Sequence, residues 1–240
     1  MLTSIIIPTY NRLPLLQEAI YSIRSSTPEA YELIVVDNGS TDGTIEFLRE
    51  QHITFVGLPS NQGFPAACNW GLRLARGEQL LLLNNDVLVA PGWLGKLRQA
   101  LCSSKQVGIA GPMSNFVSGR QQIEMRGNYT EMAEQLGTEA AGNYEEVNRL
   151  VGFCLLFSRE LMDRIGLLDE RFSPGHYEDD DYCYRARQAG YRLLMVKDTF
   201  VYHHGSASFK QEGEDAVERL LARNRMLFSD KWGVDPQQFI

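Results

Sequence analysis

Short apolar runs that end abruptly in polar residues recur along this chain. The clearest is Leu80 to Leu83, four leucines that are followed directly by Asn-Asn-Asp. The runs Ser4 to Ile7 and Glu32 to Val36 end in the same way, at a proline and at an aspartate. Continuous apolar runs of this length are typical of strands buried on both faces. The pattern therefore predicts buried strands that present polar residues at their carboxyl ends.

Apolar residues at helical spacing separate these runs. After the first predicted strand, leucine, alanine and isoleucine recur every three or four residues up to about Ser25, which predicts an amphipathic helix. Two more helices are expected at Thr44 to Glu50 and from Gly63 to Ala75, with a short strand near Ile53 to Leu58 between them. Strands that alternate with helices indicate a parallel sheet whose first loops line a crevice. The predicted fold is α/β, a single Rossmann-like domain with a mainly parallel central sheet flanked by helices.

The second half of the chain is less regular. From Met113 to Asn148 the periodicity weakens and glycines become frequent, with one helix expected near Thr130 to Leu136. A long stretch of this kind inside a compact domain is often a functional loop or lid. The other predicted elements are helices at Trp93 to Leu101, Arg159 to Ile165 and from about Gly213, and strands at Val107 to Ala110, Leu150 to Phe157 and Arg192 to Val196.

Length and charge limit the class of protein. With 240 residues, the chain can form one sizeable α/β core or at most two small domains. Its formal net charge of −7 argues against nucleic acid as a bulk partner, because phosphate backbones are bound by basic surfaces. A small ligand that carries phosphate would then need a metal ion or local basic groups.

The cysteines and the apolar segments indicate a cytoplasmic location. Cys68, Cys102, Cys154 and Cys183 are scattered without paired spacing, which predicts buried thiols in a reducing compartment rather than disulfides or zinc ligands. The longest apolar run, Leu150 to Phe157, is far too short to span a bilayer, and no charged leader precedes the first strand. We expect no signal peptide and no transmembrane segment. Peripheral contact with the inner face of a membrane is left open.

The polar residues after the leucine run are the first candidates for chemistry. Asp86, flanked by Asn84 and Asn85, is placed at a strand end where a carboxylate can hold a hard cation against phosphate oxygens. A turn that ends the strand explains the same residues, since Asn and Asp are common turn formers. On the residues alone, both interpretations stay open.

Asp37, at the end of the second predicted strand, is another candidate. Its carboxylate can accept hydrogen bonds from a base or a ribose, and Gly39 would let the backbone approach a ligand closely. Helix capping is the alternative, for which Ser40 to Asp42 supply three good residues. Small residues after Gly63 would admit a diphosphate or a sugar at the next helix, although close packing explains them equally well.

Four consecutive acids, Glu178 to Asp181, form the third candidate site. They stand at the predicted start of a helix, where the helix dipole favours negative charge. Four are more than capping requires, and their mutual repulsion raises the proton affinity of one of them, which suits a general base. The adjacent pair His203 and His204 follows a late strand and precedes a glycine, an arrangement that favours a role beyond structure.

Four sequence blocks identify a resemblance to a known family. They are Ser-Ile-Ile-Ile-Pro-Thr-Tyr-Asn-Arg at 4–12, Val-Val-Asp-Asn-Gly-Ser-Thr-Asp-Gly-Thr at 35–44, Asn-Gln-Gly at 61–63 and Leu-Asn-Asn-Asp at 83–86. In this order and at these separations, the chain resembles family 2 glycosyltransferases with the GT-A fold. Within that family it is most similar to the bacterial rhamnosyltransferase-like branch that builds cell-surface polysaccharides.

The resemblance implies a role for each residue that matches the family's motifs. Asp179 matches the catalytic base and Glu178 the acid beside it, while Asp181 would orient the acceptor or cap its helix. A divalent cation, Mg²⁺ or Mn²⁺, would be held by Asp86 and by His203, which matches better than the histidine after it. The family's metal-binding motif is Asp-x-Asp, and this chain has an asparagine, Asn84, at the first position of that motif. The residues that would bind the nucleotide sugar are Pro8, Thr9, Tyr10, Arg12, Asp37, Asn38, Gly39, Asn61, Gly63, Asn69, Asn84 and Asn85.

The activity that the resemblance implies is transfer of a sugar, with inversion, from a nucleoside diphosphate to an acceptor hydroxyl. Deoxythymidine or uridine diphosphate sugars are the expected donors. A glycan or a lipid-linked molecule is the expected acceptor, and a protein or peptide is its main rival. Within one domain, residues 1–112 would bind the donor, and residues 113–240 would bind the acceptor and carry out catalysis.

Three other classes of protein share parts of the pattern. A sugar nucleotidyltransferase would carry a glycine-rich loop with Arg and Lys after the first strand, and a Rossmann dehydrogenase would carry Gly-x-Gly-x-x-Gly there. This chain has Pro-Thr-Tyr-Asn-Arg at that place. A non-catalytic module that binds nucleotide sugars would more often have lost the base or the metal residues, and here both Asp179 and Asp86 are present.

Overall fold

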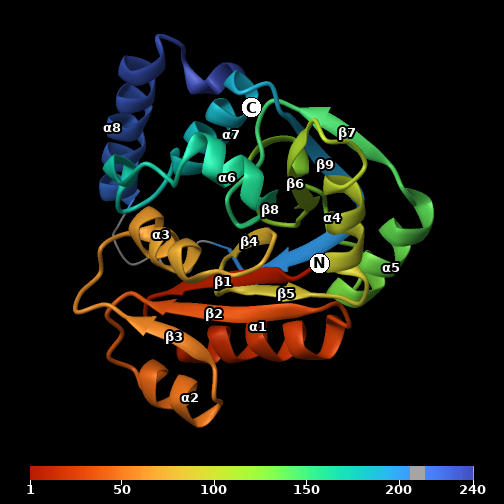
Figure 1. Cartoon of the computed structure of the whole chain (residues 1–240), viewed down its shortest axis with the longest axis vertical. Helices are drawn as coiled ribbons and strands as arrows, with labels where there is room; N and C mark the ends of the chain where they lie inside the picture. The colour runs from red at the N-terminus through yellow and green to blue at the C-terminus, as the bar shows by residue number, and fades with distance from the viewer. Residues whose placement is uncertain (206–213, 240) are drawn as a thin grey trace.

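A nine-stranded mixed sheet forms the centre of the molecule (Figure 1). The computed structural model describes residues 1–205 and 214–239. The strand order is β3-β2-β1-β4-β8-β6-β9-β5, and β7 pairs with β9 outside this path. The strands are β1 (Thr3–Thr9), β2 (Tyr31–Asp37), β3 (Thr54–Gly57), β4 (Gln79–Leu83), β5 (Val87–Val89), β6 (Val107–Met113), β7 (Tyr144–Val147), β8 (Cys154–Ser158) and β9 (Arg192–His203).

The first half of the chain is the predicted alternation of strands and helices. Strands β3, β2, β1 and β4 are paired in parallel, so their carboxyl ends lie at one edge of the sheet. Figure 1 places α1 (Leu13–Ser26) on one face of these strands and α3 (Phe64–Leu74) on the other. The helical periodicity of α1 is confirmed, because Leu16, Ala19, Ile20 and Ile23 are buried on one side.

The second half departs from a parallel arrangement. Among the described strands, four pairings are parallel and four are antiparallel. Strand β8 lies antiparallel between β4 and β6, and it begins at Cys154 rather than at the predicted Leu150. Leu150 and Phe153, which precede β8, are buried but are not part of the strand. Between them, Gly152 N donates to a side chain of α7. Strand β9 continues past the predicted Val196 to His203, because its last residues pair with β5.

The stretch from 113 to 148 is more regular than its composition indicated. It contains α5 (Tyr129–Glu139), which includes the helix predicted there, and β7, which the sequence analysis missed. Among the four residues of β7 only Val147 is buried, so no apolar run marks the strand. The other helices are α2 (Thr44–Glu50), α4 (Trp93–Leu101), α6 (Arg159–Ile165), α7 (Glu178–Gln188) and α8 (Glu214–Trp232), with 3₁₀ turns η1 (Gly119–Gln121), η2 (Glu170–Phe172) and η4 (Pro236–Phe239).

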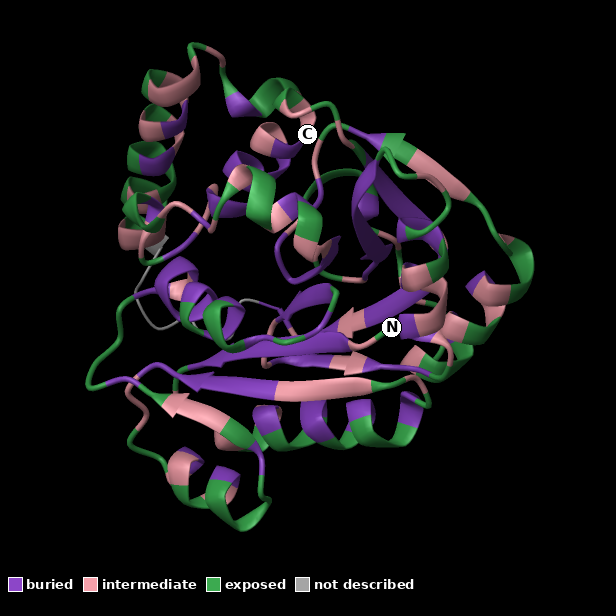
Figure 2. Cartoon of the chain, viewed as in Figure 1, coloured by how far each residue is buried: buried purple, intermediate pink, exposed green. Residues whose placement is uncertain are grey.

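The sheet is covered by a hydrophobic cluster on each face, and Figure 2 shows its strands as mostly buried. Successive side chains of a strand point to opposite faces. Accordingly, Ile5 and Ile7 pack in the cluster that includes α1 and α4, whereas Ile6 packs in the cluster that includes α3, α6 and α7. The leucines of β4 divide in the same way. This double burial explains why these strands read as continuous apolar runs.

The cysteine prediction holds for three of the four thiols. Cys68, Cys154 and Cys183 are buried, whereas Cys102 is exposed because it caps the end of α4 at the surface. In the described part of the chain, no helix combines the length and hydrophobicity needed to cross a membrane.

Candidate active site

A cavity of about 1000 Å³ opens at the edge of the sheet where parallel strands end. Residues that follow β1, β2 and β4 line one part of it, and residues 149–153 and 174–180 line another, together with His203 at the end of β9. The crevice predicted from the polar strand ends is therefore present. Both halves of the chain contribute to its wall.

Eight of the twelve residues predicted to bind the nucleotide sugar line this cavity. Asn38 organises part of this wall, because its Nδ2 donates to Asn61 Oδ1 at 2.9 Å and its Oδ1 accepts from Gln62 N at 2.9 Å. Asn85 Nδ2 donates to Thr9 Oγ1 at 2.8 Å, which joins the ends of β4 and β1. The eight lining residues are Pro8, Thr9, Tyr10, Arg12, Asn38, Asn61, Asn84 and Asn85.

Three of the remaining four residues lie behind the lining. Asp37 is fully buried, and both carboxylate oxygens lie 3.3 Å from Ser40 N. Gly39 and Gly63 have positive φ. A Cβ on Gly39 would lie 2.8 Å from the nearest atom of another residue, and a Cβ on Gly63 would lie 2.7 Å from one. The neighbours are Ser60 for the first and Ser173 for the second. Close packing against these serines therefore requires glycine at both positions.

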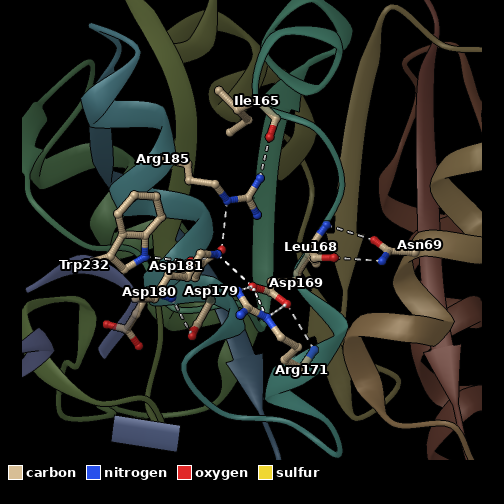
Figure 3. Close-up of polar contacts among 11 residues, drawn as sticks. Asn69, Ile165, Leu168, Asp169, Arg171, Asp179, Asp180, Asp181, Arg185 and Trp232 are labelled. Atoms are coloured by element: carbon tan, nitrogen blue, oxygen red, sulfur yellow. Dashed lines mark hydrogen bonds and ion pairs between the residues drawn. The ribbon is translucent and has the colours of Figure 1, made fainter. Parts of the chain in front are cut away.

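Asn69 does not line the cavity, which contradicts its predicted place near the base, ribose or phosphates. Its side chain makes a reciprocal pair with the backbone of Leu168, at 2.9 and 3.0 Å (Figure 3). It also donates to Glu170 Oε1 at 2.8 Å. A buried amide must find such partners, and here they lie about a hundred residues away in the chain. Asn69 therefore ties α3 to the segment that precedes α7.

Asp86 and His203 form a buried pair at one end of the cavity. His203 Nε2 lies 3.1 Å from Asp86 Oδ1, and the side chains are 11% and 7% exposed. His203 Nδ1 lies 2.7 Å from Phe116 O. A carbonyl can only accept, so Nδ1 donates to Phe116 O, and Nε2 faces Asp86 Oδ1 and, at 3.3 Å, Asn84 Nδ2. His204 is turned elsewhere, with Nε2 3.4 Å from Glu18.

This pair fits a divalent cation that is shared with a phosphorylated ligand. A neutral imidazole nitrogen whose other nitrogen donates to a carbonyl is the usual form of a metal-bound histidine. The described residues contain no group of three or more His, Cys, Asp or Glu that could hold a metal. Mg²⁺ and similar ions are commonly bound by one or two protein ligands together with substrate phosphates and water. Asp86 and His203 could supply the protein part of such a site.

Asp179, at the start of α7, also lines the cavity. Its Oδ2 accepts from Gly152 N at 2.7 Å, and its Oδ1 accepts from Asp180 N at 2.9 Å. The residue is 6% exposed and contributes to the cavity wall. A Cβ on Gly152 would lie 3.1 Å from Asp179 Cβ, so the glycine permits this close approach. Two backbone donors hold the carboxylate in one orientation.

The acids on either side of Asp179 differ in their partners. Glu178 Oε2 is buried without a hydrogen-bond partner, and burial together with the charge of Asp179 raises the pKa of Glu178 well above its usual value. Asp180 pairs with Arg149 at 2.6 Å. Burial and the charge of Asp179 still raise the pKa of Asp180 to about 7, against the effect of Arg149. The cluster therefore retains a proton near neutral pH.

Asp181, which was predicted to orient the acceptor or to cap its helix, makes structural contacts away from the cavity. It is fully buried, is absent from the cavity lining, and accepts from Arg185 Nε at 2.8 Å (Figure 3). Lys231 Nζ at 2.6 Å and Trp232 Nε1 at 2.8 Å donate to its other oxygen. Asp181 thus joins α7 to the end of α8.

The sequence analysis missed several residues of the site. Arg149 and Phe116 lie in or next to the weakly periodic stretch, where nothing in the local pattern marked them. Asn115, beside the cavity, makes a reciprocal pair with the backbone of His203 at 3.0 and 2.9 Å. Asp180 was part of the acid run, and only its ion pair with Arg149 distinguishes it. Each depends on a partner distant in sequence.

The architecture is the GT-A fold, which solved glycosyltransferase structures share. The mannosyltransferase PcManGT from Pyrobaculum calidifontis, solved with GDP-Man and Mn²⁺, superposes with a TM-score of 0.72 over 99% of this chain and 66% of that chain. The sequence identity is 22%, so this likeness establishes the fold alone. Residues 4–166 match the family model "Glycosyl transferase family 2". The chain therefore belongs to this family.

Relatives of different lengths match the chain. An uncharacterized protein of Sinorhizobium fredii is 32% identical over 91% of this chain, but the chain spans only 26% of that protein. The N-acetylglucosaminyl-diphospho-decaprenol L-rhamnosyltransferase of Mycobacterium tuberculosis is 26% identical over 92% of this chain and 80% of its own length. The same transferase region is therefore found both in much longer proteins and as most of a shorter one.

Proposed function

We propose that this chain transfers a sugar from a nucleoside diphosphate sugar to an acceptor hydroxyl, with inversion at the anomeric carbon. One observation carries the proposal. A single cavity of about 1000 Å³ is lined both by a buried carboxylate–imidazole pair and by a carboxylate held by backbone donors. The carboxylate–imidazole pair suits a cation that binds the diphosphate leaving group. The carboxylate held by backbone donors suits a general base.

The donor side is formed by the residues after β1, β2 and β4. Asn38, Asn61 and the backbone near Tyr10 offer polar groups to a nucleoside, and Arg12 adds a positive charge to the cavity wall. We propose a deoxythymidine or uridine diphosphate sugar as donor. Residues 1–112 form this side, and residues 113–240 form most of the acceptor side, within one domain.

Asp86 and His203 would hold Mg²⁺ or Mn²⁺ against the diphosphate. When bound, such a cation stabilises the negative charge that develops on the leaving diphosphate. Phe116 O keeps the histidine in the tautomer that can bind it, and Phe153 stacks on the imidazole with ring centroids 5.5 Å apart. The protein thereby fixes the ligand geometry before the cation arrives.

Asp179 is the proposed general base. Its two hydrogen bonds from Gly152 N and Asp180 N fix its orientation toward the cavity wall. The acceptor hydroxyl would lose its proton to Asp179 as the oxygen forms a bond to the anomeric carbon and the bond to the diphosphate breaks. One in-line displacement of this kind inverts the configuration. Glu178, which retains its proton, can donate a hydrogen bond to a sugar oxygen.

A glycan or a lipid-linked sugar is the proposed acceptor, in assembly of a cell-surface polysaccharide or glycoconjugate. The support is the relationship to a transferase whose name specifies a lipid diphosphate-linked acceptor. A protein or peptide acceptor is the alternative. We propose a cytoplasmic location with contact at the inner face of the membrane.

The test is release of nucleoside diphosphate from a panel of nucleotide sugars with Mg²⁺ or Mn²⁺. Asp179→Asn should lower turnover by about 10²- to 10⁴-fold, as expected for loss of a general base, without weakening donor binding. Asp86→Ala should lower turnover and donor affinity together. Asp163→Asn, at an exposed aspartate of α6, is the matched control and should retain full activity. Nucleotide binding without any turnover would instead support a non-catalytic binding module.

A further inference from the structure

Helix α8 holds the loop that leads into the acid cluster. Asn224 is fully buried, and its Nδ2 lies 2.8 Å from Phe172 O, 2.9 Å from Gly175 O and 2.9 Å from His176 O. The preceding residue, Arg223, donates to Ser173 O at 2.8 Å and to Arg171 O at 2.9 Å. Two consecutive residues of α8 therefore bind five backbone carbonyls of a segment about fifty residues earlier in the chain.

The bound loop has an unfavourable backbone conformation at its end. His176 and Tyr177 have φ values of 71° and 72°, in the left-handed region that side chains with a Cβ rarely adopt. Such a conformation persists only where surrounding contacts impose it. Tyr177 is the N-cap residue of α7, so its backbone sets the direction in which Glu178 and Asp179 leave the loop.

The other side of the loop contacts the nucleotide side of the cavity. Phe64 N donates to Pro174 O at 2.8 Å, and Ser173 Oγ donates to Gln62 O at 3.2 Å. Leu221, one turn before Asn224, lines the cavity itself. The loop is thus fixed between the donor side and α8, and α8 lies beyond residues 4–166, which match the family model.

We propose that Asn224 is a positioning residue for the transfer reaction, holding residues 172–177 so that Glu178 and Asp179 face the acceptor. The inference rests on the proposed function. The Asn224 amide acts only as a donor here. Its Nδ2 faces the three carbonyl oxygens, and its Oδ1 is buried without a partner. Replacing it with aspartate keeps the size of the side chain but places a carboxylate against three carbonyl oxygens. Replacing it with alanine removes the donors alone.

The kinetic experiment compares Asn224→Ala and Asn224→Asp with Phe228→Ala. Phe228 is fully buried one turn further along α8, and its ring contacts Tyr184 of α7 with centroids 5.7 Å apart. The Asn224 variants should lower kcat by about 10²-fold, the usual effect of a misplaced reacting group, with the KM for the donor unchanged within about twofold. Phe228→Ala should lower the melting temperature at least as much and keep kcat. If Phe228→Ala and the Asn224 variants lose the same stability and also the same kcat, the proposal is wrong.

Hydrogen exchange supplies a readout that does not require activity. Asp181 N donates to Tyr177 O at 2.9 Å, in the first turn of α7. Amides of residues 172–182 should exchange faster in the Asn224 variants than in Phe228→Ala, when the variants are compared at equal global stability. Unchanged exchange there would refute the positioning role. If wild-type protein binds nucleotide but transfers no sugar, the proposed function fails while the exchange data still decide whether Asn224 holds the loop.

Discussion

At the scale of single residues, adjacent acids on α7 have opposite environments. Asp179 accepts two backbone hydrogen bonds, which stabilise its negative charge, whereas Glu178 has a buried oxygen without a partner. The helix places successive side chains about 100° apart, so neighbours in sequence reach different surroundings. One carboxylate is thereby suited to accept a proton and the other to keep one.

Replacing Glu178 with glutamine should stabilise the protein increasingly as pH rises. Because the folded-state pKa of Glu178 is raised, the folded chain keeps a proton that the unfolded chain has lost above about pH 4.3. This cost to wild-type stability is absent below that pH and grows until the raised pKa is passed. The advantage of Glu178→Gln in free energy of unfolding should therefore increase as the pH rises from about 4.3 through neutrality.

Urea unfolding of both proteins across this pH range measures the effect. Glu160→Gln, at an exposed position of α6, is the control, and its difference from wild type should stay flat with pH. A flat difference for Glu178→Gln as well would mean that Glu178 is ionised in the folded protein, contrary to its lack of a partner.

At the scale of elements, the segment after β6 orients the end of β9. Asn115 exchanges two hydrogen bonds with the backbone of His203, and Phe116 O accepts from the imidazole. These residues are almost ninety positions apart in the chain. The pairing matters because β9 must end at a fixed position for its last side chain to meet Asp86.

Replacing Asn115 with alanine should weaken cation binding without removing a proposed ligand. Loss of the two contacts lets the end of β9 move, and loss of outer contacts around a metal ligand typically costs about 10- to 100-fold in affinity. Titration of Mn²⁺ in the presence of the bound nucleoside diphosphate measures this change. Asn148→Ala, at an exposed asparagine, should leave the Mn²⁺ affinity at the wild-type value.

At the scale of the whole molecule, helix α8 is joined to α7 and to the start of η2 by buried charges. Lys231 of α8 donates to Asp181 at 2.6 Å and to Asp169 at 2.8 Å. Trp232 adds a second contact to Asp181 (Figure 3). Arg185 completes the set from α7 itself. The two positive groups offset the burial of the Asp181 carboxylate and keep α8 against the acid cluster.

Replacing Asp181 with asparagine should therefore destabilise the fold strongly. Removal of one partner leaves buried cations without their counter-charge, which costs about 3 to 5 kcal/mol. Arg225→Ala, also on α8, removes an exposed pair with Asp235, which lies beyond the helix, and should change stability far less. Urea unfolding at neutral pH compares the two. Similar small losses in both variants would mean that the buried network does not hold α8 in place.

The sequence by itself determined the parts of the protein that local pattern records. Continuous apolar runs identified the strands β1, β2 and β4 because both of their faces are buried, and the polar residues that follow them do line the cavity. Helical spacing identified α1, and the acid run marked the start of α7. The motif blocks led to the family that the comparisons establish.

Only the tertiary structure decided which polar residues face the cavity. Asn69 and Asp181 resemble site residues in sequence, but their side chains bind partners elsewhere in the fold. Arg149, Asn115 and Asn224 carry no local signal and gain their places through contacts with distant residues. The physical reason is that periodicity reports whether a side chain is buried, whereas the partner of a buried polar group is set by which distant segments the fold brings together.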